Sequence, residues 1–263
     1  MPEIKGSIYR IQRKDIPVRY DPRGLKLSWD SLKPKDLIHL LNDSRPVVRD
    51  KAVDAIIDRG DAILDLMSNL IVESSDSVFR KRCLWAISRI KSKSSLVFLQ
   101  KALKDLDSGV RQVAVRSLGR LKDKTALMPL AALLSDSSPS VRAAAATAIG
   151  QLDDKKALPY LFRNLNSNDP VHTKHSFVYA ITQIGDAAEV SSYLSDNSYP
   201  YRQRIALRVL ASLDNNLDSR KVIPLLRSAD SNVRQEARIL ISSHKDMKKE
   251  IIKIFQDIIK EEE

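Results

Sequence analysis

The sequence is poor in cysteine, glycine and aromatic residues, and each shortage narrows the folds and sites open to the chain. Its 263 residues include one cysteine, Cys83, so an internal disulfide and a cysteine-based zinc site are excluded. Cys83 lies beside Leu84 and Trp85, and this apolar setting predicts a buried, unreactive thiol. With 7 glycines and 5% aromatic residues, the composition favours helices over sheets. No run of about 18 apolar residues occurs, so no transmembrane segment is expected.

Positive charge is what the chain has in excess. It carries 44 Lys and Arg residues against 33 Asp and Glu residues, a formal net charge of +11. Such an excess favours acidic partners, which include nucleic acid, anionic lipid and acidic protein. A solvated basic surface without a specific partner has the same composition, so charge alone does not decide between these alternatives.

A short pattern, Val-Arg-x-x-Ala, recurs at a fixed interval. Its arginine position is occupied by Arg49, Arg80, Arg111, Arg142 and Arg234. The first four arginines are equally spaced, and the last follows after close to three further periods. Two degenerate copies fill the gap, with Lys174 and Gln203 in the arginine position. Seven units with a period of about 31 residues predict a stacked array of helix pairs rather than a fold with a single core.

Each unit is expected to consist of two short helices. The second helix begins near the Val-Arg pair and keeps apolar residues 3, 7 and 10 positions after the arginine, as in Ala145, Ile149 and Leu152. Arg59 is an exception to this pattern. Amphipathic runs before each pair predict the first helices at residues 36–41, 63–72, 96–106, 126–134, 158–165, 189–194 and 222–227. The fold class is therefore all-α, a superhelical solenoid of about seven helix pairs.

Three recurring pieces, Leu-Leu-x-Asp, Val-Arg-x-x-Ala and Ile/Leu-Gly-x-Leu, stand clearest in LAALLSDSSPSVRAAAATAIGQLDD, residues 130–154. In these pieces the chain resembles the HEAT-repeat family, in particular the short bacterial repeats of phycobilin-lyase-like proteins. The resemblance covers residues 32–243, which we take as the solenoid domain. It implies that the second helices line the concave side, and it is specific for the fold but weakly informative about function.

The repeated arginines have a structural and a functional interpretation. Three of them follow an aspartate at a distance of six residues, in the pairs Asp43–Arg49, Asp105–Arg111 and Asp136–Arg142. A guanidinium can bind a carboxylate and turn carbonyls at the same time. We therefore expect Arg49, Arg80, Arg111, Arg142 and Arg234 to form a structural ladder between neighbouring units, rather than a ligand site.

Partner binding is expected on another face of the second helices. If the arginine is position 0, positions +5 and +9 lie one helical turn apart and away from the core positions. In the second and third units they place Trp85, Arg89, Arg116 and Arg120 together, and tryptophan and arginine are enriched at binding hot spots. A weaker group consists of Tyr179, Arg204 and Arg208. The alternative is that Trp85 packs between helices and the arginines are a solvated surface.

The most regular unit is expected to contribute least to binding. Its second helix, SVRAAAATAIGQL, has small side chains that allow close helix packing. Its +5 and +9 positions hold Thr147 and Gln151, which carry no charge.

No catalytic arrangement is evident. His172 and His175 are three residues apart, but no third metal ligand lies at helical spacing from them, so no metal site is expected. There is no glycine-rich phosphate loop, nucleophile elbow or paired-carboxylate motif, so neither an enzymatic activity nor a cofactor is predicted.

The two ends differ from the repeats. Residues 1–31 are predicted to be an extended segment, because residues 7–11 (SIYRI) alternate polar and apolar side chains. The stretch from Gly6 to Ile11, followed by the first repeat, resembles a junction in large bacterial proteins that join a glucose-dehydrogenase-type β-propeller to HEAT repeats and a cytochrome c domain. Residues 244–263 are predicted to form an amphipathic capping helix, with apolar residues that recur every three or four positions.

Several functions remain open from the sequence. The first is a scaffold that binds a protein or an acidic peptide on its concave face. The second is a nucleic-acid-binding solenoid, which the net charge favours. A partner of a cofactor enzyme, by analogy with the phycobilin family, and the accessory HEAT region of a propeller dehydrogenase are further alternatives. The chain would be cytoplasmic if Met1 is its native start, and extracytoplasmic if it belongs to such an exported protein.

Overall fold

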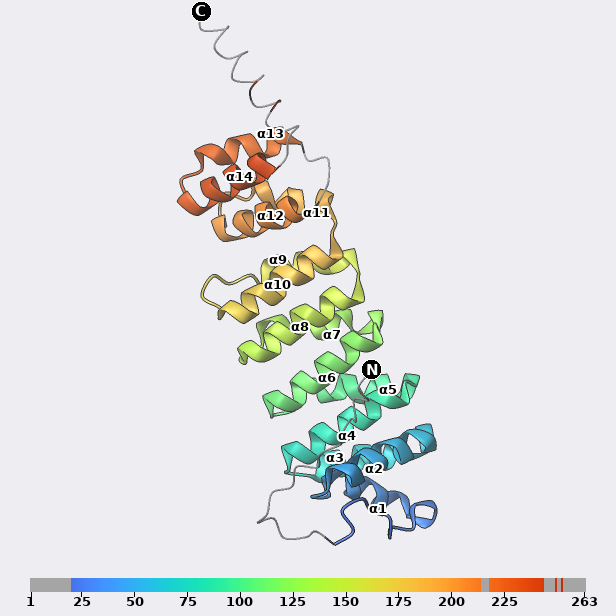
Figure 1. Cartoon of the computed structure of the whole chain (residues 1–263). Helices are drawn as coiled ribbons and strands as arrows, with labels where there is room; N and C mark the ends of the chain where they lie inside the picture. Colours follow the sequence, from blue (N-terminus) through green and yellow to red (C-terminus); the bar gives the residue numbers. More distant parts are fainter. Residues whose placement is uncertain (1–19, 214–217, 244–248, 250–251, 253–263) are drawn as a thin grey trace, which may run out of the picture.

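The chain folds into a column of stacked helix pairs. The computed structural model describes residues 20–213, 218–243, 249 and 252. Figure 1 shows the pairs following one another from α1 at one end to α14 at the other, with each pair beside its sequence neighbours. No strand occurs in these described ranges. The prediction of an all-α solenoid is confirmed.

The second helices keep the period that the sequence predicts. The first four begin at Pro46, Ser77, Ser108 and Pro139, which are equally spaced along the chain. The second helices are α2 (Pro46–Arg59), α4 (Ser77–Ile90), α6 (Ser108–Leu121), α8 (Pro139–Leu152), α10 (Val171–Ile184), α12 (Pro200–Ser212) and α14 (Ser231–Ser243).

The first helices are shorter, and several are continued by 3₁₀ turns. They are α1 (Pro34–His39), α3 (Leu64–Glu73), α5 (Lys93–Ala102), α7 (Leu127–Ala132), α9 (Leu158–Arg163), α11 (Ala187–Ser192) and α13 (Ser219–Val222). Aspartates in the turns cap the helices that follow. Asp76 and Asp107, for example, accept hydrogen bonds from the amides of Val78 and Val110.

Core residues lie where the helical spacing predicts. Position +3 of the first four second helices holds Ala52, Cys83, Ala114 and Ala145, and all four are fully buried. Burial raises the pKa of the Cys83 thiol to about 12, so the thiolate is disfavoured and the prediction of an inert cysteine is confirmed. Arg59, which breaks the apolar pattern, donates a hydrogen bond to the carbonyl of Leu32 before the first pair.

Small residues let the central second helices approach closely. A Cβ on Gly150 of α8 would lie 2.8 Å from the Cα of Ala180 in α10. A Cβ on Gly119 of α6 would lie 2.7 Å from the Cβ of Ala148 in α8. Accordingly, α6, α8 and α10 pack on one another more extensively than α2 does on α4 or α10 does on α12.

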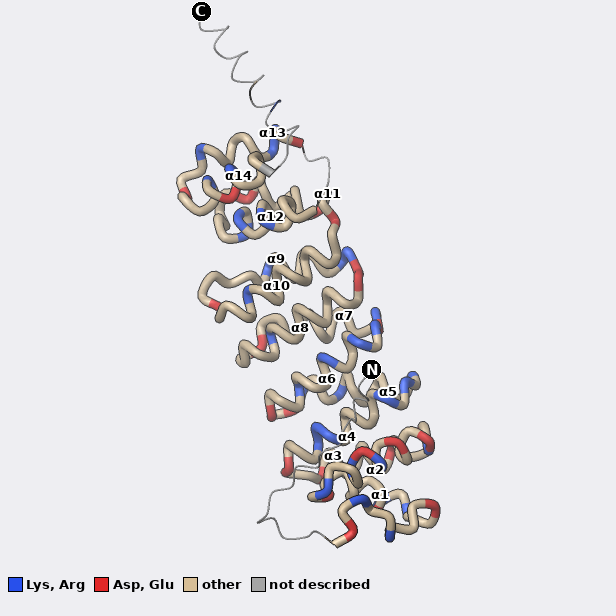
Figure 2. Tube along the Cα trace, viewed as in Figure 1, with Lys and Arg blue, Asp and Glu red and all other residues tan. Residues whose placement is uncertain are grey.

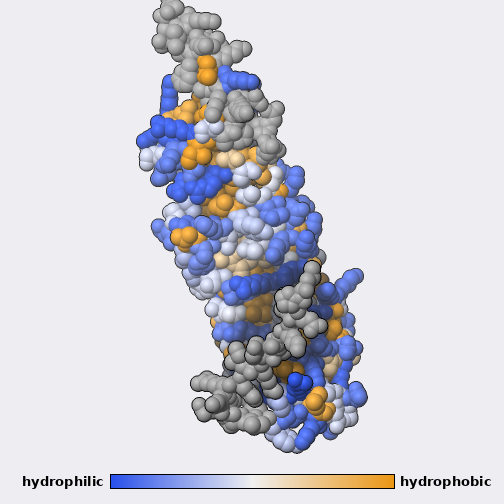
Figure 3. Space-filling view, in the orientation of Figure 1, coloured by the Kyte–Doolittle hydropathy of each residue, from blue (hydrophilic) through white to orange (hydrophobic). Residues whose placement is uncertain are grey.

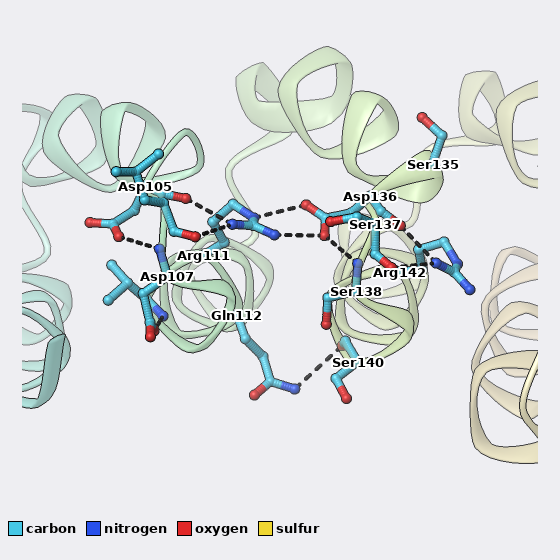
Figure 4. A network of polar contacts seen from close by, with 12 residues as sticks. Asp105, Asp107, Arg111, Gln112, Ser135, Asp136, Ser137, Ser138, Ser140 and Arg142 are labelled. Carbon is cyan, nitrogen blue, oxygen red and sulfur yellow. Dashed lines mark hydrogen bonds and ion pairs between the residues drawn. The ribbon is translucent and has the colours of Figure 1, made fainter.

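The repeated arginines join consecutive turns. Arg111 donates from Nε and Nη2 to the two carboxylate oxygens of Asp136, each at 2.8 Å, and from Nη1 to the carbonyl of Asp105, also at 2.8 Å (Figure 4). Arg80 repeats this arrangement with the carboxylate of Asp105, at 2.9 and 2.8 Å, and the carbonyl of Ser74. Each arginine thus binds the carbonyl of its own turn and the carboxylate of the next turn.

This geometry differs from the sequence expectation in one respect. The aspartate six residues before an arginine offers that arginine its backbone carbonyl, while its carboxylate binds the arginine of the preceding unit. Arg142 follows the same rule with the carbonyl of Asp136 at 2.7 Å and the carboxylate of Asp169. Asp43 has no preceding unit, and its carboxylate binds Arg45 instead.

The carbonyl contact persists even where the carboxylate contact does not. Within the described residues, Arg49 and Arg234 each donate to turn carbonyls, those of Asp43 and Ser228, and form no carboxylate pair. In the turn after Arg49, Ser74 stands at the position that Asp105 has in the turn after Arg80. Its hydroxyl carries no charge, so it cannot form an ion pair with Arg49. In the degenerate units, Lys174 donates to the carbonyl of Ser167 and Gln203 to that of Leu194.

The predicted end segments fall mostly outside the described residues. The strand expected at residues 7–11 lies in the undescribed range 1–19, and the capping helix of residues 244–263 is described at residues 249 and 252 alone. Residues 20–32 form turns and one 3₁₀ turn, Trp29–Ser31, beside the first pair. The indole of Trp29 donates to the carbonyl of Gly24 at 2.9 Å. The three domain boundaries remain predictions.

Arg111→Ala should destabilise the protein more than Arg49→Ala. The first change removes four hydrogen bonds and leaves the 7% exposed carboxylate of Asp136 without its ion pair, at a cost of about 3 kcal/mol. The second removes one bond to a carbonyl, at a cost of about 1 kcal/mol. Urea unfolding followed by circular dichroism measures both. Equal losses would show that the link between turns contributes nothing beyond the carbonyl contact.

The contribution of Asp136 should depend on pH. Burial alone would raise the pKa of Asp136, but hydrogen bonds from Arg111 and the amide of Ser138 outweigh it and lower the pKa. The stabilisation is therefore present above the ordinary aspartate pKa and is lost as the pH falls through the lowered value. The stability gap between the wild type and Asp136→Asn should be largest near neutral pH and shrink toward pH 3. A gap that stays constant across that range would contradict this.

Gly150→Ala should lower stability although alanine favours helices by about 1 kcal/mol. The added methyl meets the backbone of Ala180, which cannot rotate away, and such overpacking costs about 1–3 kcal/mol. Gly109→Ala is the matched control, since its methyl would meet only the side chains of Asp107 and Lys81. Thermal melting of the two variants compares them, and a stabilised Gly150→Ala protein would show that the α8–α10 contact is adaptable.

Candidate binding face

The positions predicted to be open are accessible. Trp85 on α4 is 41% exposed, and Arg89, Arg116 and Arg120 are all exposed. Core residues of the same helices, such as Leu84 and Val115, are at most 1% exposed. Trp85 therefore does not pack in the core, and the four residues share the outer side of α4 and α6. Whether they bind a partner remains a prediction.

Trp85 and Arg120 form a stacked pair between two repeats. The guanidinium carbon of Arg120 lies 4.5 Å from the centroid of the Trp85 ring. Arg120 also donates to the hydroxyl of Ser88 at 3.5 Å, and Ser88 in turn donates to the carbonyl of Trp85. A cation over an indole at an exposed site contributes about 0.5–1 kcal/mol. The stack holds a flat aromatic surface beside a fixed positive charge.

Arg89 and Arg116 carry charges that the described part of the protein does not neutralise. Neither forms a hydrogen bond or an ion pair with a described residue. The ladder arginines of the same helices, Arg80 and Arg111, are paired with carboxylates. On these helices the arginines at position 0 are therefore paired within the protein, whereas Arg89 at position +9 and Arg116 at position +5 have donors that face solvent.

A groove of about 440 Å³ opens beside the stack. Trp85, Arg116 and Arg120 line one side of it. The remaining lining residues come from α6 and α8 and are mostly small: Val113, Ser117, Ala144, Thr147, Ala148 and Gln151. The small side chains of α8 thus contribute to the shape of this face, and the expectation that the most regular unit contributes least to binding stays a prediction.

The second predicted group is divided by the structure. Tyr179 on α10 is 52% exposed. Arg204 and Arg208 on α12 instead face Glu236 of α14, which pairs with Arg208 and lies 3.8 Å from Nε of Arg204. The sequence reasoning missed Glu236, whose position opposite two arginines depends on how α14 stacks on α12. Their charges are partly neutralised, so this group is the weaker candidate.

The neighbouring helix α2 presents the opposite charge. Asp50, Asp54 and Asp58 recur every four residues along α2, and all three are exposed. Asp54 and Asp58 occupy positions +5 and +9, which on α4 hold Trp85 and Arg89. The positive area is therefore bounded by carboxylates on one side and by the uncharged Thr147 and Gln151 on the other. Figure 2 shows Lys and Arg positions in blue on α4 and α6 and a mostly tan α8.

A family model described as HEAT repeats matches residues 34–119 and 96–182 of this chain. The two matches together span residues 34–182, more than half of the sequence. The chain belongs to the HEAT-repeat family. No curated protein matches it. The expected junction with a β-propeller is not supported, because the family match begins at residue 34 and concerns the repeats alone.

Several solved structures resemble this HEAT-repeat chain at low identity. The complex of CpcE and CpcF of phycocyanin lyase from Nostoc sp. PCC7120 is 18% identical, with coverage of 91% of this chain and 100% of the other and a TM-score of 0.45. A designed armadillo repeat protein in complex with the peptide (KR)4 is 20% identical, with coverage of 80% and 98% and a TM-score of 0.41. Human deoxyhypusine hydroxylase in complex with glycerol is 12% identical, with coverage of 86% and 99% and a TM-score of 0.40. Identities this low say nothing about function.

The described residues offer no metal site and no membrane-spanning helix. Among the described residues, no group of three His, Cys, Asp or Glu side chains could hold a metal ion. His172 and His175 are both exposed on α10. In the same ranges, no helix has the length and apolar character needed to cross a membrane. The surface seen in Figure 3 is mainly hydrophilic, with hydrophobic areas that are scattered along the column.

Proposed function

We propose that this HEAT-repeat protein is a non-catalytic scaffold that binds an acidic segment of a partner protein on the solvent-exposed side of α4 and α6, which belongs to the expected concave face of the solenoid. The observation that carries the proposal is the Trp85–Arg120 stack flanked by Arg89 and Arg116, whose charges have no counter-charge among the described residues. The HEAT-repeat fold supports it, because stacked helix pairs present extended surfaces that suit binding.

Carboxylates are the complementary groups for this surface. A guanidinium presents planar donors that match the two oxygens of a carboxylate, and such charge-assisted bonds are stronger than neutral ones. The exposed arginines of neighbouring helices repel one another, and a bound acidic chain would relieve that repulsion. Trp85 adds rigid apolar area, and tryptophan with arginine is a typical composition of binding hot spots.

The charge order along the face favours a short acidic protein segment over nucleic acid. At positions +5 and +9 of the second helices, the arginines that lack an ion pair with a described residue lie on α4 and α6. A phosphate backbone that continued along the second helices toward α2 would meet Asp54 and Asp58. The net charge of +11 still favours nucleic acid as the second candidate, so the experiment includes it.

Charge reversal of Arg89, Arg116 and Arg120 together should abolish binding of an acidic peptide. The probe is fluorescein-labelled hexaglutamate, and fluorescence anisotropy with the full chain measures its affinity. We expect at least about a tenfold loss, which corresponds to about 1.4 kcal/mol. Circular dichroism should show unchanged helicity, because all three side chains are exposed.

Lys93→Glu, Lys124→Glu and Lys156→Glu together form the matched control, since they change the net charge equally at exposed sites outside the groove. Equal losses in both triple variants would show long-range attraction without a site. A random oligonucleotide that binds more tightly than the peptide, with an affinity that falls steeply with salt, would replace the proposal with the nucleic-acid alternative.

A further inference from the structure

The groove beside Trp85 is large enough to accept a side chain of a bound partner. Its volume of about 440 Å³ falls within the range of about 300–1,000 Å³ that is typical of ligand pockets. A larger hollow of about 580 Å³ lies beside α3 and α5, and the arginine in its lining, Arg80, is already paired with Asp105. The groove beside Trp85 is bordered instead by arginines that remain available.

We infer that this groove accepts an apolar or aromatic anchor residue of the acidic segment, while carboxylates that flank the anchor bind the arginines around it. This inference rests on the proposed function and specifies the sequence class of the partner: an acidic stretch interrupted by one large apolar residue.

Much of the lining of the groove is apolar, and most of its residues on α8 have small side chains. Ala144 and Ala148 of α8 are 7% and 1% exposed and, with Val113 of α6, give the groove an apolar part, while Ser117 and Thr147 add hydroxyl groups to its lining. The hollow exists because these residues are alanines while Trp85, on the opposite side, is large. Burying an aromatic or aliphatic side chain in such a place is favourable because its apolar surface leaves water.

The border of the groove is suited to the residues beside the anchor. Arg116 and Arg120 line the groove together with Trp85, so a chain whose anchor lies inside passes within reach of both guanidiniums. Gln151 lines the other side and forms no hydrogen bond with a described residue, so its amide is available for a peptide backbone. The indole offers an aromatic face for an aromatic anchor.

Two peptides of equal charge test the anchor. Fluorescein-labelled EEFEEE and EEAEEE are titrated with the full chain, and anisotropy gives the affinity ratio between them. We expect the phenylalanine peptide to bind about tenfold more tightly, which is the effect of about 1.4 kcal/mol. Thr147→Leu fills the groove without a change of charge and should remove this preference, while the affinity for the alanine peptide stays within about twofold.

Gln183→Leu is the matched control, because Gln183 is an exposed position +9 on α10 and does not line the groove. It should keep the preference of the wild type. Thr147→Ala enlarges the groove and should also keep the preference for the phenylalanine peptide. Thr147→Met supplies the same test as the leucine variant if that variant fails to fold.

The outcomes separate the inference from the proposed function. If both peptides bind with equal affinity, the anchor inference is wrong and the acidic scaffold stands. If neither peptide binds, the proposed function is wrong, and the inference falls with it. A preference that survives in the folded Thr147→Leu or Thr147→Met protein would place the anchor elsewhere and overturn the inference.

Discussion

The link between consecutive turns is the interaction on which the arrangement of the repeats depends. In a solenoid each unit contacts only its neighbours, so the angle between units must be set locally. Arg111 does this by binding the carbonyl of its own turn and the carboxylate of Asp136 in the next. Asp136 also accepts the amide of Ser138 at the start of α8, so one carboxylate positions both the neighbour and the following helix. Where the carboxylate is missing, the carbonyl contact remains, as for Arg49.

Arginine occurs in two different environments on α4 and α6, according to its position along the helix. At position 0, arginine lies beside a turn and its charge is neutralised. At positions +5 and +9 it projects from the outer side, where no described carboxylate reaches Arg89 or Arg116. Part of the net positive charge is therefore concentrated in one area. The carboxylates of α2 and the uncharged residues of α8 limit that area to the width of two repeats.

Close helix packing and the groove have one physical origin. Glycine and alanine on α6 and α8 allow the backbones to approach, and they leave little side-chain volume on the outer side of α8. Next to them stands Trp85, the largest side chain at any of the open positions on the second helices. A regular unit beside an irregular one thus forms a hollow that neither would form alone, and the candidate site lies at the boundary between them.

The features that repeat along the chain could be predicted from the amino-acid pattern alone: the constant period of the units, the pairing of helices, the buried position +3 and the exposure of Trp85 and its arginines. These follow from helical periodicity, which acts within one segment. Which groups meet across repeats depended on the three-dimensional packing. The carboxylate of Asp136 binds Arg111 of the preceding unit and not Arg142, and Glu236 lies opposite Arg208. Ala144 and Ala148 form the floor beside Trp85. Such meetings depend on the rotation and spacing of one helix relative to the next, which the links between turns and the side-chain volumes at the contact between repeats set together.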